Sequence, residues 1–486
     1  MLTGGLPDQV PPGDALPGET LTEALPGEAL PAEAVAPADQ TLLDQALPGE
    51  AMPPEAAALA ERSDAVCRMG AMILATGTAS YRVKRAMGRV AEALDIDTLE
   101  AQVTLNEIVV TTRRHGFSRT RVVEVSTPLV NADRICELMR ISLRAQPGLS
   151  PEELHHQLDA VEHKPHLYPL PMVCTAAALA CAAFAFLNQG AWPDCLVAAL
   201  GAAIGKGVQV WLRRFRVNQL VVVALASAAA CCAAAAAGTA ARLFLVPGYS
   251  LHQVAVIAST LFLVPGFPLL AAALDLARFD FAAGMSRLLF AGLVTVAGAA
   301  GICPVTWMLA LPFADGGRSH LAAGLLLVLR ALASFAGVLG FALTFNTPLR
   351  VALATACIGT LGNLLRLSAI DLGGSTLPCA AAATLLIGLL VGSVNRRLLA
   401  ARITLSVPAV LIMIPGMTAY RSILSSVADR PLDALAYGMT SVSAVCALTA
   451  GLIVARMITD PVWAESLQVW THPPHTYTAD RLREEH

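Results

Sequence analysis

Charged side chains and catalytic signatures are both scarce in this chain of 486 residues. Only 14% of the residues are charged and 5% are aromatic, whereas 56% are hydrophobic and the mean hydropathy is +0.62. The sequence contains no GxSxG, HExxH, Walker loop or CxxC pair, so it predicts neither an enzyme nor ATP-driven transport. This composition is typical of a protein embedded in a lipid bilayer.

Ligands for metals and nucleic acids are also poorly represented. The 11 cysteines are scattered through apolar stretches, and their spacing does not suit zinc. His155, Asp159 and His163 recur on one face of a predicted helix, where a solvated helix surface is the favoured interpretation. With 33 basic and 36 acidic residues, the charge balance indicates no nucleic-acid partner. We therefore expect no metal ion and no cofactor.

The region before the apolar segments divides into two parts. Residues 1–55 repeat an ALPGE theme and carry no lysine or arginine, which predicts a disordered acidic leader. Residues 56–165 predict a small cytoplasmic α/β domain. Its expected elements are helices over 65–74 and 82–94, a strand from Val103 to Arg114, a reversal at His115 and Gly116, and helices from Asn131 and Pro151.

Ten apolar segments follow, each long enough to cross a hydrocarbon core of about 30 Å. They lie at 170–188, 193–212, 217–237, 251–274, 284–311, 320–344, 349–365, 377–394, 403–427 and 433–456. The sequence therefore predicts a polytopic all-α membrane protein with ten transmembrane helices. We expect two five-helix repeats, at 166–312 and 319–458, and a tail at 459–486.

The distribution of arginine predicts the orientation in the membrane. With the amino terminus inside, the inner connections are richer in arginine than the outer ones, and they include Arg213, Arg214 and Arg397. This is the bias expected for cytoplasmic loops. Because ten crossings return the chain to its starting side, we expect both termini in the cytoplasm and a multi-pass location in the inner cell membrane.

Two Pro-Gly pairs occupy corresponding places in the fourth and ninth segments. Pro265-Gly266 is followed 150 residues later by Pro415-Gly416. A weaker echo relates the second and seventh segments. Because each repeat has an odd number of helices, the second copy must enter the membrane from the opposite side. The pattern thus predicts the 5+5 inverted repeat that many secondary transporters use for alternating access.

Each Pro-Gly pair lies near the middle of the bilayer by helical rise. Proline removes an amide donor, glycine lets the backbone leave helical geometry, and such breaks persist at that depth only inside protein or beside a wet cavity. We expect the four residues of the two pairs to bind a zwitterionic amino acid, although two simple proline kinks are the alternative. The expected hydroxyl partners are Ser259, Thr260, Thr418 and Tyr420.

Four charged residues within or beside the segments are candidates for proton coupling or charge compensation. Lys206 is also a candidate for substrate binding, and snorkelling to the inner surface is its alternative. Arg330, near the centre of the sixth segment, should face the bundle or pair with an acid. Asp275 and Asp371 lie at segment ends, where anchoring a helix is the more ordinary role.

The chain resembles the threonine and serine exporter family over about residues 62–456. The matching stretches are GTASYRV from Gly77, the strand from Val103 to Arg114, Val264-Pro265-Gly266 with Asp275, and Ile414-Pro415-Gly416 with Tyr420. The resemblance implies a cytoplasmic amino-terminal domain, ten spans and export of threonine and serine driven by protons. Some relatives divide the two halves between separate chains and are associated with dicarboxylates.

Together these features predict a proton-coupled secondary exporter of threonine and serine, which could form homo-oligomers. A dicarboxylate exporter of the same fold is one alternative. A membrane-anchored hydrolase or sensor that acts through the α/β domain is an alternative from a different class.

Overall fold

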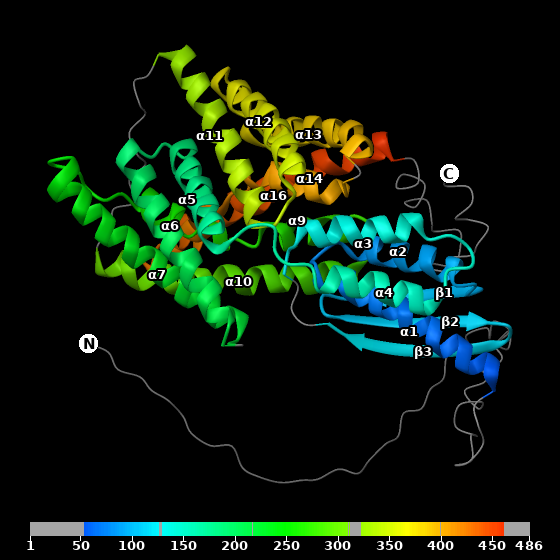
Figure 1. The fold of residues 1–486 in the computed structure, drawn as a ribbon. Coiled ribbons are helices and arrows are strands. Elements are labelled where there is room, and N and C mark those ends of the chain that lie inside the picture. Colours follow the sequence, from blue (N-terminus) through cyan, green and yellow to red (C-terminus); the bar gives the residue numbers. More distant parts are fainter. Residues whose placement is uncertain are drawn as a thin grey trace, which may run out of the picture. The chain divides into compact units, whose positions relative to one another are not determined.

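The computed structural model describes residues 53–125, 129–215, 217–309, 311, 322–398 and 400–460. Helices dominate this part of the chain, and three strands form one small sheet (Figure 1). Most of the expected acidic leader and almost all of the expected tail lie outside the described residues.

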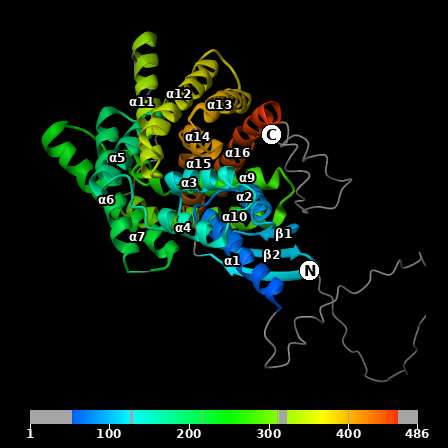
Figure 2. The same cartoon turned by 45° about the vertical axis from the view of Figure 1, so that its right-hand side comes forward.

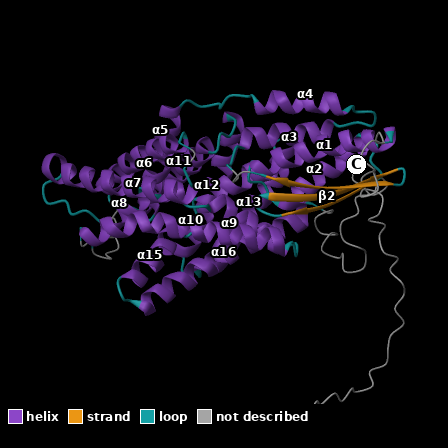
Figure 3. Ribbon diagram, turned by 90° about the horizontal axis from the view of Figure 1, so that it is seen from below, coloured by secondary structure: helices purple, strands orange, loops and turns teal. Residues whose placement is uncertain are grey.

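Residues 54–162 form a unit that we call the sheet module. Its elements are α1 (Pro54–Ala75), α2 (Ser80–Ala93), β1 (Thr98–Val103), β2 (Glu107–Arg114), β3 (Phe117–Glu124), α3 (Ala132–Arg144) and α4 (Pro151–Glu162). The antiparallel sheet has the order β1-β2-β3, with α1 and α2 packed against it and α3 and α4 packed against those helices. Figure 3 shows the three strands together, with α3 and α4 on one side of them.

The sheet follows from alternation in the sequence. Leu99 and Ala101 on β1, and Ile108 and Val110 on β2, are buried while their neighbours are more exposed, as expected when one face of a sheet covers a core. The predicted reversal is confirmed, because His115 and Gly116 have φ of 48° and 84°, which suits a two-residue hairpin turn. The prediction of one strand beginning at Val103 is wrong, because β1 ends there and a turn precedes β2.

The membrane part consists of two helical bundles. The first bundle contains α5 (Leu170–Leu187), α6 (Trp192–Arg213), α7 (Gln219–Ala240) with its π-helical end η2 (Ala241–Leu245), α8 (Gln253–Ala258), the short η3 (Leu261–Leu263), α9 (Gly266–Leu276) and α10 (Phe281–Met308). The second bundle contains α11 (Ala323–Thr344), α12 (Leu349–Asp371), α13 (Thr376–Leu398), α14 (Arg402–Leu411), α15 (Gly416–Val427) and α16 (Pro431–Thr459).

The described helices confirm a multi-span membrane protein. Eight of them are long and apolar enough to cross a bilayer, and the number rises to ten if each of two bent helix pairs counts as one span. These elements match the ten expected segments closely. The main differences are the third span, which continues through η2 to Leu245 rather than ending near residue 237, and α12, which continues to Asp371 rather than ending near residue 365.

The two bundles repeat the same packing order. In the first, α6 lies between α5 and α7, and α9 packs on α10; in the second, α12 lies between α11 and α13, and α15 packs on α16 (Figure 2). Small residues allow the helices to approach closely. A Cβ at Gly201 on α6 would lie 2.7 Å from the Ala230 carbonyl oxygen on α7, so this crossing requires glycine.

Candidate functional site

Both Pro-Gly pairs interrupt a span with almost the same backbone geometry. Pro265 has φ −78° and ψ 52°, and Pro415 has φ −77° and ψ 53°. In each case the glycine amide donates to the carbonyl oxygen two residues earlier at 2.8 Å, and the next helix begins at that glycine. The axes bend by 64° at the first break and by 55° at the second.

The two breaks lie against each other in the interior of the membrane part. A side chain at Gly266 would collide with Leu411 and Ile414 of the other break. A Cβ at Gly416 would lie 2.8 Å from a methyl group of Leu261. The sequence therefore predicted correctly that the breaks are enclosed by protein, and the structure adds that the amino-terminal ends of α9 and α15 meet.

The carbonyl groups at the breaks have found other donors. Because Pro265 and Pro415 have no amide hydrogen, they cannot donate to the carbonyl groups of Leu261 and Leu411, four residues earlier. Instead, the amides of Val264 and Ile414 donate to them at 3.2 and 3.1 Å, because each helix tightens by one residue before its proline. Because Gly266 and Gly416 already donate and residue 268 is proline, the polar groups that the breaks present are the amides of Phe267 on α9 and of Met417 and Thr418 on α15, which have no intrahelical acceptor.

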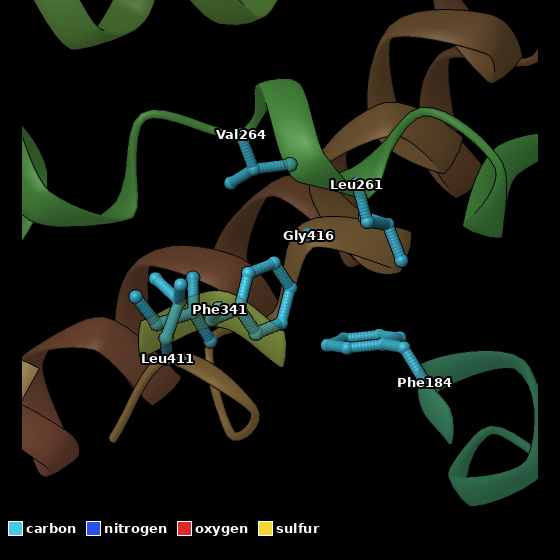
Figure 4. A pocket seen from close by; sticks show the side chains of 7 residues that line it. Phe184, Leu261, Val264, Phe341, Leu411 and Gly416 are labelled. Carbon is cyan, nitrogen blue, oxygen red and sulfur yellow. The ribbon is translucent and has the colours of Figure 1, made fainter. Parts of the chain in front are cut away.

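The space between the breaks is closed. Seven residues line it: Phe184, Leu261, Val264, Phe341, Leu411, Ile414 and Gly416 (Figure 4). Its volume is about 10 Å³, which is at most enough for one water molecule. Phe184 comes from α5 and Phe341 from α11, so an aromatic ring from each bundle lines this space. An amino acid can enter only if these side chains or the half-helices move.

The predicted hydroxyl groups lie near the breaks, but most of them bond to backbone. Ser259 and Thr260 donate to the carbonyl oxygens of Val256 and Ile257 at 2.6 and 2.8 Å. Thr418 donates to the Pro415 carbonyl at 2.9 Å and accepts from Ser441 at 2.8 Å. These three hydroxyls therefore need to reorient before they could bind a solute.

Tyr420 is the exception among the predicted hydroxyls. Its side chain is fully buried, and its hydroxyl has no hydrogen-bond partner among the described residues. A Cβ at Gly298 on α10 would lie 2.5 Å from the Tyr420 oxygen, so glycine makes room for this hydroxyl. A buried polar group without a partner carries an energetic cost. Tyr420, which belongs to the second bundle, therefore places an unpaired hydroxyl against α10 of the first bundle.

Lys206 is held inside the protein and does not snorkel to the surface. Its side chain on α6 is 9% exposed, its ammonium donates to Gln209 Oε1 at 2.9 Å, and it lies 5.8 Å from the centre of the Phe262 ring. Phe262 belongs to η3, directly before the first break. The structure therefore places a buried cation one side chain away from that break.

Arg330 and Asp371 form a pair with each other, as the sequence allowed for Arg330. Nη2 of Arg330 lies 3.5 Å from Oδ1 of Asp371, and the side chain of Asp371 is 53% exposed. Arg330 is in the first half of α11 and its partner is the last residue of α12. Arg330 thus pairs with an acid, as expected. The pair is partly exposed, whereas the glycines of the two breaks are buried.

Asp275 is fully buried at the end of α9 and is bonded to Arg287 on α10. Ser80 at the start of α2 also donates to it, from the amide at 3.2 Å and from the hydroxyl at 3.1 Å. The structure thus gives Asp275 the anchoring contacts that segment-end acids usually make, and one of its partners belongs to the sheet module.

The histidine and arginine groups of the sheet module pair locally. Arg68 donates to Glu162 at 2.7 Å and to His155 at 3.2 Å, and its hydrogen bond to Asp159 lowers the pKa of that carboxyl. No metal-binding group of three or more side chains occurs among the described residues. Around the hairpin, Arg114 pairs with Asp95 at 2.6 Å and Arg119 pairs with Asp64 at 3.2 Å.

Two family models cover most of the described chain. A model for a threonine/serine exporter matches residues 64–309, and a second one, described as "Threonine/Serine exporter, ThrE", matches residues 330–458. The chain belongs to the threonine/serine exporter family. It is therefore a multi-span membrane protein of a transporter family rather than of an enzyme class.

Curated relatives match about half of this exporter-family chain. It is 29% identical over 254 residues to the "Probable succinate transporter subunit YjjP" of Escherichia coli (strain K12), and the matched region covers 50% of this chain and 94% of that protein. The protein of the same name from Klebsiella aerogenes is 27% identical and covers 47% of this chain and 87% of its own length. No solved structure gives a significant match.

Several residues of this exporter were not foreseen from its sequence. Phe184 and Phe341 line the closed space, Gln209 holds Lys206, and Arg287 holds Asp275. An apolar ring inside an apolar segment carries no signal of its own. The sequence did carry a signal for Arg287, because a charged residue at the seventh position of a helix that spans a membrane requires a buried partner.

Proposed function

We propose that this protein is a secondary active exporter of threonine and serine that works by alternating access around the two Pro-Gly breaks. The observation that carries the proposal is that two bent spans, one from each bundle, bring their breaks together in a closed space. The amides of Phe267 on α9 and of Met417 and Thr418 on α15 are suited to the carboxylate of an amino acid. The Tyr420 hydroxyl is the nearby side chain that needs a partner.

The bundles correspond to a 5+5 inverted repeat in this proposal. Matching φ and ψ at Pro265 and Pro415, and the matching order of helix packing, support a common origin. Two oppositely oriented copies can exchange conformations at nearly equal energy, which opens the central space first to one side and then to the other. The first repeat would occupy residues 166–312 and the second residues 319–458.

The sheet module corresponds to the cytoplasmic domain expected at residues 56–165, and both ends of the chain would lie in the cytoplasm. The arginine-rich connections on that side support this orientation in an inner cell membrane. Residues 1–55 would be an acidic leader and residues 459–486 a cytoplasmic tail.

Lys206 is the coupling residue in this proposal. A buried ammonium can release its proton when the site opens to one face and regain it at the other. The short distance from Lys206 to Phe262 at the first break supports a link between its charge and the shape of the site. Arg330, Asp371 and Asp275 are given structural roles, because each is already paired away from the breaks.

A dicarboxylate is the second candidate substrate, and the charge of the site favours it. The amino-terminal ends of α9 and α15 carry partial positive charge beside the closed space, and Lys206 lies behind Phe262 next to the first break, whereas the lining of the space contains no acidic side chain. This set can compensate two carboxylates, but it offers little to an ammonium group. The names of the YjjP relatives agree with this choice of anion.

Flux measurements on purified protein in lipid vesicles test both candidates. Labelled threonine, serine and succinate are exchanged in separate experiments, with and without a proton gradient. We expect saturable flux of one class that is accelerated by an opposing proton gradient, and loss of that response in Lys206→Met. Absence of flux for all three solutes under every gradient would contradict the proposed function.

A further inference from the structure

The sheet module contacts the first bundle through the first turn of α2. The residue before α2, Ala79, makes no side-chain cap, and the buried carboxylate of Asp275 accepts from the Ser80 amide and hydroxyl instead. Ser80 also donates to Asp280 at 2.7 Å, and Lys84 donates to Asp280 at 2.8 Å. A carboxylate at a helix amino terminus is favourable, so the α9–α10 corner caps a helix of the module.

The module contacts the second bundle through the start of α3. The amides of Ala132 and Asp133 donate to the carbonyl oxygens of Phe345 and Asn346 at 2.9 and 3.2 Å. The Asn346 amide group donates to Asn131 at 3.0 Å. The carboxyl-terminal end of α11 therefore meets the amino-terminal end of α3, which satisfies orphan backbone groups of both helices.

These two contacts differ in kind. Ile135 and Cys136 on α3 belong to the same buried apolar cluster as the membrane helices. The buried apolar side chains of α2, such as Val83 and Met87, belong to the module's own cluster. The module is thus joined to the second bundle by apolar packing and hydrogen bonds. Its contact with the first bundle through α2 is a set of charged and polar bonds.

The α9–α10 corner can lose α2 without leaving a charge unpaired inside the protein. Asp275 keeps Arg287, which belongs to the same bundle. Asp280 keeps its bond to the Ala283 amide at 3.4 Å and is already partly exposed. The Lys84 ammonium would be hydrated when α2 leaves the corner. Separation therefore avoids the heavy cost of an uncompensated buried ion.

We propose that the sheet module is a gate on its own face of the membrane part: it moves with the second bundle through α3 and latches the first bundle through Ser80 and Lys84. This inference rests on the proposed alternating access, in which the bundles move against each other. A module held to both bundles keeps that face shut, and in the structure the space between the breaks is indeed closed. Transport then requires the latch at the α9–α10 corner to open in every cycle.

A reversible cross-link tests the gate. Ser80→Cys and Asp280→Cys are introduced together into the full chain after the native cysteines have been replaced. Thr111→Cys with Thr120→Cys is the matched control, because these two short side chains are also in contact, at 2.9 Å, but both lie within the module. Both proteins are reconstituted, and flux of the transported solute is measured after oxidation and again after reduction.

We expect oxidation to reduce flux at least tenfold in the Ser80–Asp280 protein, with recovery on reduction and no change in the control. Recovery on reduction shows that the protein is folded. Full flux with a complete Ser80–Asp280 cross-link would overturn the gate. If the latch pair does not oxidise, a short thiol-specific cross-linker with a reducible bond joins the same two cysteines and provides the same test.

A second experiment measures labelling of a cysteine and needs no substrate, so it separates failure of the gate from failure of the proposed function. Val264→Cys, which lines the closed space, is labelled with a membrane-impermeant maleimide from the face that carries the module. We expect labelling to slow at least tenfold when the latch is cross-linked and to speed up in Ser80→Ala/Lys84→Ala. A labelling rate that stays the same after cross-linking and in Ser80→Ala/Lys84→Ala would overturn the gate, whichever solutes the protein transports.

Discussion

The corner between α9 and α10 and the corner between α15 and α16 have the same backbone but different side chains. Phe279 and Asp429 have φ of 60° and 55°. The amide of Asp280 donates to the backbone carbonyl oxygen of Asp275 at 3.1 Å, and the amide of Arg430 donates to the backbone carbonyl oxygen of Ser425 at 2.9 Å. In the first corner two carboxylates receive the sheet module, whereas the second has serine and arginine at the matching positions.

This difference separates what both bundles share from what one of them adds. The bend, the left-handed residue and the tight turn recur, so they belong to the mechanics of the repeated unit. The buried Asp275–Arg287 pair occurs only where the module docks, because residue 437, which corresponds to Arg287, is tyrosine. One corner has therefore been specialised for the module, while the other keeps the same shape without it.

Truncating Asp275 in the first corner and its counterpart Ser425 in the second should give the largest contrast. Asp275→Ala leaves Arg287 buried without its counter-ion, and we expect a loss of about 3–5 kcal/mol in the free energy of unfolding. Ser425→Ala should cost less than about 1 kcal/mol, since the Ser425 hydroxyl has no partner among the described residues. Thermal denaturation in detergent measures both. Equal losses would show that the buried pair is not what distinguishes the corners.

Filling the two glycines of the breaks should give the next largest effect. Gly266→Ala places a methyl group against Leu411, and Gly416→Ala places one against Leu261 with more space. We expect overpacking to cost about 1–3 kcal/mol, at the upper end for Gly266. Flux and thermal denaturation are compared for both variants. If Gly416→Ala proves the more damaging change, the two breaks are not packed as the structure indicates.

Lys206 has no charged counterpart in the second bundle, where the sequence echo aligns it with Thr360. We expect Lys206→Met to lower flux at least tenfold, or about 1.4 kcal/mol in the barrier, and to remove its dependence on the proton gradient. Thr360→Val should leave both nearly unchanged, since Thr360 bonds only to its own helix at Ala356. A gradient response that persists in Lys206→Met would assign coupling to another group.

The smallest effect concerns pH at the first corner. Burial opposes ionisation of Asp280, but the charge of Lys84 and hydrogen bonds from Lys84 and Ser80 outweigh it and lower the pKa of this carboxyl. Asp275, which contacts the same Ser80 hydroxyl, is a further charged group beside it. A lowered pKa stabilises docking fully above the ordinary aspartate value of about 3.9, and this contribution is lost as the pH falls through the lowered value.

We therefore expect the labelling rate of Val264→Cys from the module's face to vary little between pH 8 and about pH 5, apart from the intrinsic reactivity of the thiol. An exposed reference cysteine corrects for that reactivity. Release of the module near pH 6 or 7 would instead point to a histidine rather than to Asp280.

The sequence was sufficient for the features that depend on long patterns. The spans follow from apolar length, the hairpin from His115-Gly116, and the enclosed breaks from proline and glycine at mid-depth. What it could not supply was the pairing of distant residues. The sequence allowed Arg330 to pair with an acid and put Asp371 at a segment end, but it did not indicate that these two residues are partners.

The role of the sheet module was also beyond sequence reasoning. Ser80 lies in a stretch shared with the exporter family, yet nothing local indicates that its acceptor is an aspartate 195 residues away. The amides at the starts of α2 and α3 are capped by residues of the membrane bundles, and only the assembled fold shows this. Similarly, Thr260 and Ser259 were expected to face a solute, but backbone carbonyls compete for hydroxyls within helices.

The site between the breaks is tested most directly by substrate protection of a cysteine placed in it. Ile414→Cys is labelled with maleimide in vesicles while threonine, serine or succinate is added at increasing concentration, and Leu372→Cys, which is 89% exposed, is the control. We predict that the transported solute slows labelling of Ile414→Cys in a saturable way and leaves Leu372→Cys unchanged. Saturable transport of a solute that never protects Ile414→Cys would show that the solute does not bind between the breaks.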